Sequence, residues 1–595
     1  MTDANLSLTG FDMAGLDRAP TRAEPRVRFQ SRSQAALDQG RARLIVTAAV
    51  FSLAFGAVGL KLVDATVLSQ GSEPAATVAA SAKPAHAGRA DIVDRNGVLL
   101  ATSLATQSLY ADPKLVIDPA EAVQKIRKVL PDIDSGALLA ELRSDKRFVW
   151  IRRNLTPRQQ YEINRLGIPG FAFQREERRI YPQGGLAAHV VGFSGVDNNG
   201  LMGIEQRFDQ RLRSGEGPLQ LSIDVRLQHI LRKEVATAIE DFRAIGGAGM
   251  LMDIRTGELL AMVSLPDFDP HSPPPPQAEQ DTDPRFNRNT LGVYEMGSTF
   301  KIFNTAMALE SGRVRLSDSF DATKPIRIGR HMISDFKPEA RWMDVVDIFK
   351  HSSNIGSVRM AEEVGPAGQK EFMTRLGFMR PVSLELPELG WPMVPNPWRE
   401  VNMMTISFGH GMSVSPVHLV AATAGMVNGG VMHPPTLLKR EKGEEVPGTR
   451  VISERTSDVV RKLMRTVVTE GTATRADAAG YVVGGKTGTA EKVKGRAYSG
   501  SYRISSFVGA FPMHDPRYVV YVMVDEPKGS KQTFGYATGG WVAAPAIGRI
   551  VAQAGPLLGV RPVDPDAPEI VHALAINPQQ SAPQAQLASF PGGQR

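Results

Sequence analysis

The longest hydrophobic stretch of the chain lies near its N-terminus, where 20 residues from Leu44 to Val63 contain one charged side chain, Lys61. A helix rises about 1.5 Å per residue, so this stretch would be roughly 30 Å long, enough to cross the apolar core of a bilayer. Lys61 lies near one end, where its ammonium group can reach the interface. We expect a membrane anchor at 44–63, although a cleaved signal peptide or a buried core helix would show a similar pattern.

Charge on the N-terminal side of this stretch predicts its orientation. Between residues 26 and 43, five arginines face a single aspartate. Such an excess marks the cytoplasmic side of a membrane. We therefore expect a cytoplasmic tail at 1–43, a single-pass anchor in the inner (cytoplasmic) membrane, and a large periplasmic or extracytoplasmic C-terminal part.

Beyond the anchor, the pattern of polar and apolar positions changes several times. Residues 64–88 are rich in Ala, Ser and Pro and predict a linker. Short mixed segments at 89–225, among them a strand followed by an Asn-Gly turn near Gly97, indicate a mixed α/β unit without a catalytic constellation. Residues 556–595 are rich in Pro, Ala and Gln, so we expect a disordered tail.

The pattern at 226–555 indicates a larger α/β (α+β) unit. Leu227–Phe242 has helical periodicity, and two apolar runs around Arg255-Thr256-Gly257 predict an antiparallel hairpin. A proline-rich loop at Asp267–Pro284 precedes a helical pattern at Ser298–Glu310. Two further apolar runs, Ser506–Phe511 and Val519–Val524, read as buried strands. We expect a sheet covered by helices.

Composition and charge exclude several functions. The 595 residues contain no cysteine, which excludes disulfides, zinc-thiolate sites and thiol catalysis. The formal charge is +7, but Lys and Arg are dispersed and no basic run is interleaved with aromatic residues, which argues against nucleic-acid binding. The 11 histidines show no metal-ligand spacing. We therefore expect neither a metal nor a cofactor, and structural or surface roles for His351 and His410.

Three short motifs carry candidate chemistry. In EMGSTFK, Ser298 and Lys301 are three residues apart and can meet on one face of a helix, where a lysine with a lowered pKa could activate the serine. This pattern alone is weak, because it is also typical of a helix cap with a solvated lysine. The second motif is Ser352-Ser353-Asn354, which interrupts a helical pattern. The third is Lys486-Thr487-Gly488-Thr489, where an apolar strand runs into glycines.

Together and in this order, the three motifs resemble the Ser-x-x-Lys, Ser-x-Asn and Lys-Thr-Gly set of penicillin-recognising serine enzymes. From about Arg89 to Gly555 the chain resembles the class B penicillin-binding proteins, and among them the division-specific (septal) transpeptidases. Five further motifs carry the resemblance: Asp94–Gly97, Arg178–Pro182, Gly203–Glu205, Ser407–Gly411 and Gly539–Pro545. The resemblance implies a penicillin-binding transpeptidase fold, an antiparallel sheet flanked by helices at 226–555, and a pedestal or dimerisation-type domain at 89–225.

The resemblance also implies a role for each matched residue in a serine-type D-Ala-D-Ala transpeptidase. Ser298 would be the nucleophile and Lys301 its base, while Ser352 and Asn354 would complete the proton relay and hold the substrate amide. Lys486 and Thr487 would receive a terminal carboxylate, and Gly488 would let the ligand backbone approach. The backbone N–H groups of Ser298 and Thr489 would form an oxyanion hole. Apart from the resemblance, we hypothesise that Lys486, as a second cation near Lys301, helps to lower the pKa of Lys301.

Implied partners are peptidoglycan stem peptides, β-lactam antibiotics and membrane proteins of the division machinery, including a lipid-II polymerase. One departure from the family pattern is Met296, where the family usually has proline before the Gly-Ser pair. The flanking motifs favour septal cross-linking over a cell-elongation role. The intact residues Ser298, Lys301, Asn354 and Lys486 argue against an inactive membrane-anchored scaffold. A β-lactamase would normally lack the preceding unit. A bifunctional glycosyltransferase would need more residues before Ser298, and a sensor coupled to a metalloprotease would need a zinc motif.

Overall fold

The computed structural model describes residues 32–63, 88–329, 331–494 and 497–576. Contacts divide the chain into two units, Met1–Ala85 and His86–Arg595. Residues 1–31 of the expected cytoplasmic tail, nearly all of the expected linker at 64–88, and residues 577–595 of the expected C-terminal tail lie outside the described residues.

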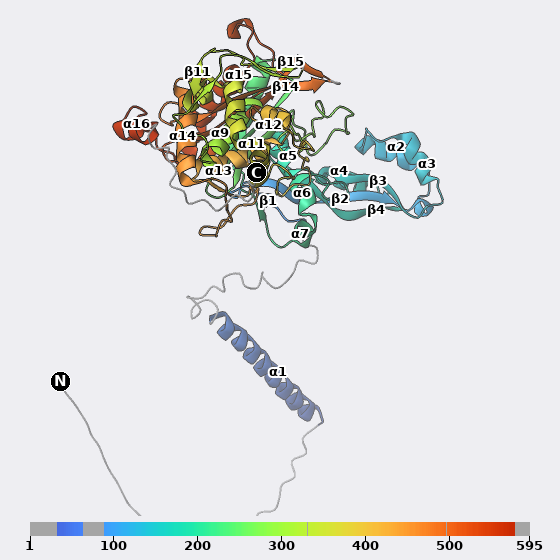
Figure 1. Ribbon diagram of the computed structural model, residues 1–595. Helices are drawn as coiled ribbons and strands as arrows, with labels where there is room; N and C mark the ends of the chain where they lie inside the picture. The colour runs from blue at the N-terminus through green and yellow to red at the C-terminus, as the bar shows by residue number, and fades with distance from the viewer. Residues whose placement is uncertain (1–31, 64–87, 330, 495–496, 577–595) are drawn as a thin grey trace, which may run out of the picture. The chain divides into compact units, whose positions relative to one another are not determined.

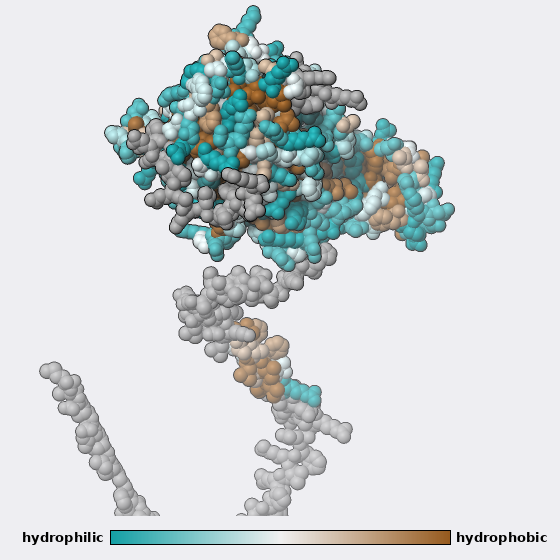
Figure 2. Space-filling model, in the orientation of Figure 1, coloured by the Kyte–Doolittle hydropathy of each residue, from teal (hydrophilic) through white to brown (hydrophobic). Residues whose placement is uncertain are grey.

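In the first unit, helix α1 (Arg32–Val63) contains the hydrophobic stretch. Its large apolar side chains between Ile45 and Val58 are 56% to 74% exposed, and they form the brown part of this helix in Figure 2. Among the described residues, we find no helix that combines the length and the apolar character needed to cross a membrane.

The second unit begins with the pedestal, a small mixed α/β domain. Its sheet runs in the order β3-β2-β1-β5, and β4 also pairs with β2. The strands are β1 (Ile92–Val93), β2 (Leu99–Ala111), β3 (Val149–Leu155), β4 (Phe171–Ile180) and β5 (Leu219–Gln220). The helices are α2 (Pro119–Val129), α3 (Ser135–Leu142), α4 (Pro157–Arg165), α5 (Ala188–Val191), α6 (Gly203–Arg207) and α7 (Asp209–Ser214).

Local sequence explains where the pedestal helices α2, α3 and α4 begin. Asp118, Asp134 and Thr156 each stand directly before one of them, and each side chain accepts hydrogen bonds from backbone N–H groups of the first turn. These caps satisfy donors that would otherwise lack partners within the helix. The three helices lie at one end of the pedestal, next to β3 (Figure 1).

The pedestal has two separate hydrophobic regions. Around Leu109 and Ile126, apolar residues form a small core of their own. Nearer the larger domain (226–555), Ile92, Ile204 and Leu221 belong to the same core as that domain. A buried ion-pair network ties this second region together, because Glu205 contacts both Arg89 (2.5 Å) and Arg179 (2.7 Å).

The larger domain is built on an antiparallel sheet with the order β14-β15-β16-β6-β7. Its strands are β6 (Gly246–Asp253), β7 (Leu259–Leu265), β14 (Gly484–Lys494), β15 (Ala497–Phe511) and β16 (Tyr518–Asp525). Every neighbouring pair is antiparallel, and β6 with β7 forms the hairpin predicted around Arg255-Thr256-Gly257. The expected α/β (α+β) class with an antiparallel sheet flanked by helices is confirmed.

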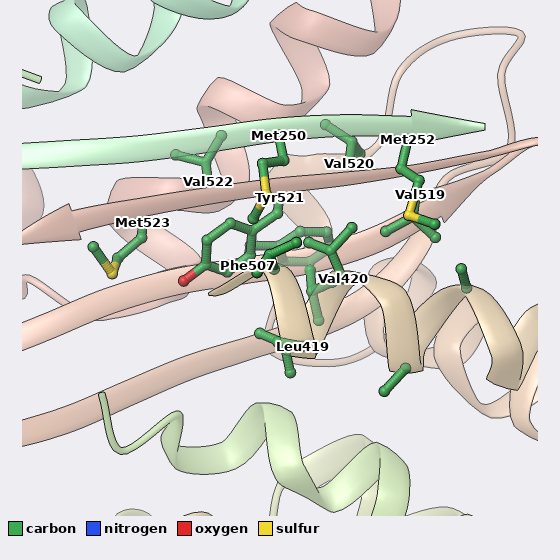
Figure 3. Packing of buried hydrophobic residues seen from close by; sticks show 14 of the residues in the cluster. Met250, Met252, Leu419, Val420, Phe507, Val519, Val520, Tyr521, Val522 and Met523 are labelled. Atoms are coloured by element: carbon green, nitrogen blue, oxygen red, sulfur yellow. The ribbon is translucent and has the colours of Figure 1, made fainter. Parts of the chain in front are cut away.

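Helices cover both faces of this sheet. On one face, α8 (Val225–Asp241) packs closely on the glycines of β6, where a Cβ at Gly249 would touch Leu231. Residues of alternating position, such as Met250, point to the other face and pack with Tyr521 and with Leu419 of α13 (Pro416–Val427) in Figure 3. Helix α15 (Gly539–Leu557) contacts α8, and α14 (Glu454–Thr469) contacts both α13 and β14.

The remaining elements surround the start of α9 (Lys301–Glu310), which lies beside α11 (Asn354–Arg375). The expected loop at 267–284 contains neither helix nor strand. The other helices are α10 (Val345–His351) and α12 (Glu400–Ile406). The short strands are β8 (Ser319–Asp321), β9 (Ile326–Ile328), β10 (His331–Ile333), β11 (Trp342–Asp344), β12 (Val431–Met432) and β13 (Thr449–Arg450).

Two expectations were wrong in detail. The expected disordered tail at 556–595 is ordered as far as residue 576, because α15 ends at Leu557 and α16 (Pro568–Leu574) follows, with Ile570 buried. The composition of the whole tail hid this short apolar segment. Strand β14 begins at Gly484, so the Lys486–Thr489 motif lies within the strand, whereas we had expected it at the end of a strand formed by the preceding apolar residues.

Candidate functional site

Ser298 lies in a 3-10 turn, Gly297–Phe300, which leads directly into α9. Gly297 has a φ of 54°, in the left-handed region, and its N–H donates to the carbonyl of Gly409 at 3.0 Å. Met296 has a φ of −86°, close to the range that proline would impose. Its side chain is buried, so the family departure at this position changes core packing more than backbone conformation.

Lys301 is the centre of the polar cluster. Its Nζ lies 3.0 Å from Ser298 Oγ, 3.1 Å from Ser352 Oγ and 2.7 Å from Asn354 Oδ1. The carbonyl oxygen of Ser352 accepts from the same Nζ at 2.7 Å. The first and second motifs, which are far apart in the sequence, thus meet at one amine.

The Ser352–Asn354 motif forms a sharp break between α10 and α11. Ser352 has a φ of 61°, a left-handed conformation that ends α10, and Ser353 caps α11. Asp335 supports this break: one carboxylate oxygen accepts from Ser353 Oγ at 2.7 Å and the other from the N–H of Ile355 at 3.0 Å and of Asn354. Asp335 therefore sets the orientation of Asn354.

The third motif reaches this cluster from the outermost strand of the sheet. Lys486 Nζ lies 2.9 Å from Ser352 Oγ, so the Ser352 hydroxyl stands between the two lysines. Both lysine side chains are almost completely buried. Gly488 packs against the backbone just before the turn that carries Ser298, since a Cβ at Gly488 would lie 2.9 Å from the carbonyl oxygen of Met296.

Burial lowers the pKa values of both lysines, and a neighbouring charge lowers that of Lys301 further. The pKa of Lys301 falls well below its usual value, first because of burial and second because of the nearby charge of Lys486, while Asp335 acts in the opposite direction. Burial lowers the pKa of Lys486 to about 7. The charge of Lys486 thus acts on the pKa of Lys301 in the direction that the sequence led us to expect.

A cavity of about 670 Å³ opens above this cluster. Of the eight residues that sequence motifs singled out, five line it: Ser298, Ser352, Asn354, Thr487 and Thr489. Lys301 and Lys486 lie buried beneath them, and Lys486 points toward Ser352 instead of the open cavity. This position fits a part in the proton relay better than the direct contact with a carboxylate that the resemblance implied.

The three sequence motifs do not include several residues that line the cavity, and the sequence predicted a different role for two of the lining residues. Asp335, Thr472, Arg475, Glu491, Arg503 and Trp541 line the cavity and stand outside the three motifs. His410 and His351, for which we had expected structural or surface roles, line it as well. Burial lowers the pKa of the His410 imidazole, and the nearby Glu295 opposes that shift. His410 lies in the Ser407–Gly411 motif, and this motif was the one signal that pointed to it.

The arrangement is suited to acyl transfer by a covalent serine intermediate. A neutral amine 3.0 Å from a serine hydroxyl can take its proton, and the lowered pKa of Lys301 favours the neutral amine. Among the described residues, no cluster of His, Asp and Glu side chains has the arrangement of a metal site.

Comparison with known proteins agrees with this geometry. Residues 247–552 match the penicillin-binding protein transpeptidase domain, and residues 84–240 match the penicillin-binding protein dimerisation domain. The probable peptidoglycan D,D-transpeptidase FtsI of Caulobacter vibrioides is 38% identical over 563 residues, covering 92% of this chain and 93% of that protein. The peptidoglycan D,D-transpeptidase FtsI of Escherichia coli K12 is 31% identical, covering 80% and 84%.

Among solved structures, penicillin-binding protein 3 of Mycobacterium tuberculosis, in complex with aztreonam, superimposes with a TM-score of 0.62. The superposition covers 81% of this chain and 98% of the chain of that structure, and the two sequences are 22% identical. At that identity, the likeness supports the fold alone.

Proposed function

This chain belongs to the class B penicillin-binding proteins and is a peptidoglycan D,D-transpeptidase of the FtsI type, and we propose that Ser298 is its nucleophile. The observation that carries the proposal is the contact of Ser298 Oγ with the buried amine of Lys301 at 3.0 Å. The donor substrate is a peptidoglycan stem peptide that ends in D-Ala-D-Ala.

In the first half of the reaction, neutral Lys301 accepts the proton of Ser298, and Oγ attacks the carbonyl carbon of the penultimate D-Ala. The negative charge that develops on the carbonyl oxygen is stabilised by the backbone N–H groups of Ser298 and Thr489. A single donor of this kind contributes about 3–4 kcal/mol to transition-state stabilisation. The peptide C–N bond then breaks, leaving an ester on Ser298.

The leaving D-Ala amine needs a proton, and Ser352 is placed to deliver it. Its hydroxyl contacts both Lys301 (3.1 Å) and Lys486 (2.9 Å), so a proton taken from Ser298 can move through Ser352 to the leaving nitrogen. Asn354 holds the substrate amide and keeps Lys301 oriented through its Oδ1 contact of 2.7 Å.

Strand β14 positions the donor peptide. Thr487 and Thr489 line the cavity along the outermost strand of the sheet, and the absent side chain of Gly488 lets backbones approach closely. An extended peptide can add to such an edge. Thr487 receives the terminal carboxylate, and Lys486 adds positive charge from below.

In the second half, an amine of a neighbouring stem peptide attacks the ester carbonyl, and its proton passes back through the same lysine and serine groups. A new peptide bond forms, the Ser298 C–O bond breaks, and the hydroxyl is regenerated. A β-lactam acylates the same oxygen by opening its ring, and the acyl group stays attached because its leaving nitrogen remains tethered.

Mass spectrometry of the penicillin-treated protein tests the assignment. We expect the intact protein to gain the mass of one penicillin, located on the peptide that contains Ser298, and Ser298→Ala to gain none. Labelling of the Ser298→Ala variant to the wild-type extent would sink the proposal, as would an unlabelled wild type. Rapid release of hydrolysed penicillin would instead indicate a β-lactamase.

The cross-links that this enzyme makes serve the division septum, and a lipid-II polymerase of the division machinery supplies the nascent strands. What supports this is the similarity to two FtsI proteins over most of the chain. Depletion of the protein in its host should give long filaments. Rounded cells that still form normal septa would instead indicate an elongation role.

The stretch 44–63 anchors the enzyme in the inner membrane, with residues 1–43 in the cytoplasm and the pedestal (89–225) and transpeptidase domain (226–555) outside. What supports this is the apolar stretch within α1, whose large side chains between Ile45 and Val58 are exposed. The full chain should fractionate with membranes and resist extraction by high salt, and a chain that starts at His86 should be soluble. Full-length protein in the soluble fraction would overturn the anchor.

A further inference from the structure

Arg475 and Trp541 form one wall of the cavity above Ser298. The guanidinium carbon of Arg475 lies 3.6 Å from the centre of the Trp541 ring, a close cation–π stack. Trp541 is itself supported by Tyr536, whose ring is nearly parallel to it at 9°, and by the edge of Phe534. The stack therefore holds Arg475 in one orientation, which lowers the entropy lost when it binds a ligand.

This wall stands at the Thr487 end of the cavity. Trp541 follows Gly540, where a Cβ would lie 3.8 Å from Cγ2 of Thr487. Thr487 Oγ1 also hydrogen-bonds to Thr472 Oγ1 at 2.9 Å, and Arg475 comes one short turn after Thr472. A group bound by Thr487 is thus next to the Arg475 guanidinium.

Arg475 also differs from the other cations of the site. Lys301 and Lys486 are buried below the cavity floor, and burial lowers the pKa of both, to about 7 for Lys486, so Lys486 offers less than a full charge to a ligand. Arg475 is exposed, permanently charged and without an ion pair among the described residues. Two other lining cations lie elsewhere: Arg503 is paired in register with Glu491 further along β14, and Lys337 lies near Asp335.

We propose that Arg475, held flat on Trp541, binds the terminal carboxylate of the donor peptide together with Thr487, and so selects donors that carry a free C-terminal carboxylate. This inference rests on the proposed function. The guanidinium can present two parallel N–H donors to the two carboxylate oxygens, while Thr487 provides a hydroxyl. β-Lactams that carry a carboxylate next to the ring nitrogen use the same contact.

A matched pair of thioester donors tests the inference. Both contain the same N-acyl-D-Ala group; one leaves as a thiol with a free carboxylate, and the other as the methyl ester of that thiol. Both give the same acyl-enzyme, so a difference in kcat/KM reports the contact with the leaving group. The full-length protein is compared as wild type, Arg475→Gln, Arg475→Lys and, as a matched control on the same cavity, Arg503→Gln.

Arg475→Gln should lower kcat/KM for the carboxylate donor by about 10- to 100-fold, the range expected for one charge-assisted hydrogen-bond pair. The methyl ester donor should change by less than about 2-fold, Arg475→Lys should recover part of the loss, and Arg503→Gln should leave the ratio of the two donors unchanged. The inference is overturned if Arg475→Gln affects both donors equally or neither. Absence of Ser298 acylation in the wild type would overturn the proposed function itself.

Discussion

Lys486 is the residue whose charge most directly controls the catalytic amine. Replacing it with methionine removes the nearby positive charge that lowers the pKa of Lys301. Because Lys301 acts as a base only when neutral, a higher pKa moves the acidic limb of the rate profile to higher pH. We expect Lys486→Met to acylate more slowly and to show this shift when labelling by a fluorescent penicillin is followed from about pH 5 to 9. An unchanged limb would contradict the role of Lys486.

The same substitution should stabilise the fold. Burial lowers the folded-state pKa of Lys486 to about 7, below its unfolded value, so between those values the unfolded chain binds more protons. The contribution of Lys486 to the free energy of unfolding is therefore most favourable above its unfolded-state pKa, and it is lost as the pH falls toward 7. Methionine has no such loss, so Lys486→Met should raise the free energy of unfolding at pH 7 by a few kcal/mol, on the order of 2–4.

Chemical denaturation at about pH 7 and pH 10 measures this difference. The gain from methionine should shrink at the higher pH, where folded-state Lys486 is neutral and the pH approaches the unfolded-state pKa. Lys492→Met is the matched control on the same strand: its ammonium pairs with Asp281 and Asp525, which raise its pKa, so that substitution should destabilise. A stability gain that does not depend on pH would contradict the explanation by burial.

At this scale, the sequence pointed to the residues that we propose as nucleophile and base, but not to the residues around them. Ser298 and Lys301 were recognisable because their spacing brings them together on one helix. Asp335 and Arg475 were not, because each acts through a tertiary contact with a residue distant in sequence and neither stands in a motif. The burial of Lys486, which changes its expected role, likewise depends on packing that spacing does not encode.

The break between α10 and α11 depends on Asp335 as a shared acceptor. In Asp335→Asn, the amide group offers one acceptor oxygen and turns a donor toward groups that also donate. We expect a loss of about 1–3 kcal/mol in unfolding free energy and slower acylation, because Asn354 and Lys301 lose their mutual orientation. Asp134→Asn, a cap of the pedestal helix α3, serves as the control and should leave acylation unchanged. Wild-type acylation by Asp335→Asn would contradict this.

At the scale of elements, long periodic segments were predictable and short ones were not. The α8 helix and the β6–β7 hairpin have strong patterns and appear as expected. The start of β14 was misplaced because its glycine-rich sequence has weak strand propensity and is held by pairing with β15. Helix α16 was missed because a few apolar residues were averaged into a polar tail.

The pedestal depends on Glu205, which is fully buried between Arg89 and Arg179. Glu205→Gln would leave two buried guanidinium groups without their shared carboxylate, a change that typically costs about 3–5 kcal/mol. We expect lower stability of the region around α6 in hydrogen exchange, while penicillin still acylates Ser298 in the folded fraction. Glu121→Gln, which removes an exposed pair with Lys125, is the control and should change stability by less than about 0.5 kcal/mol.

For the whole molecule, the open side of β14 has a consequence for solubility. An unpaired outer strand usually invites the sheets of other molecules to join it and begin aggregates. Here the strand forms one wall of a cavity of about 670 Å³, beside the turn that carries Ser298 and the start of α15. That enclosure leaves room for one extended chain and blocks a second folded sheet. The unpaired N–H and C=O groups of β14 therefore remain available to the substrate, while pairing with the sheets of other molecules, which would start aggregation, is prevented.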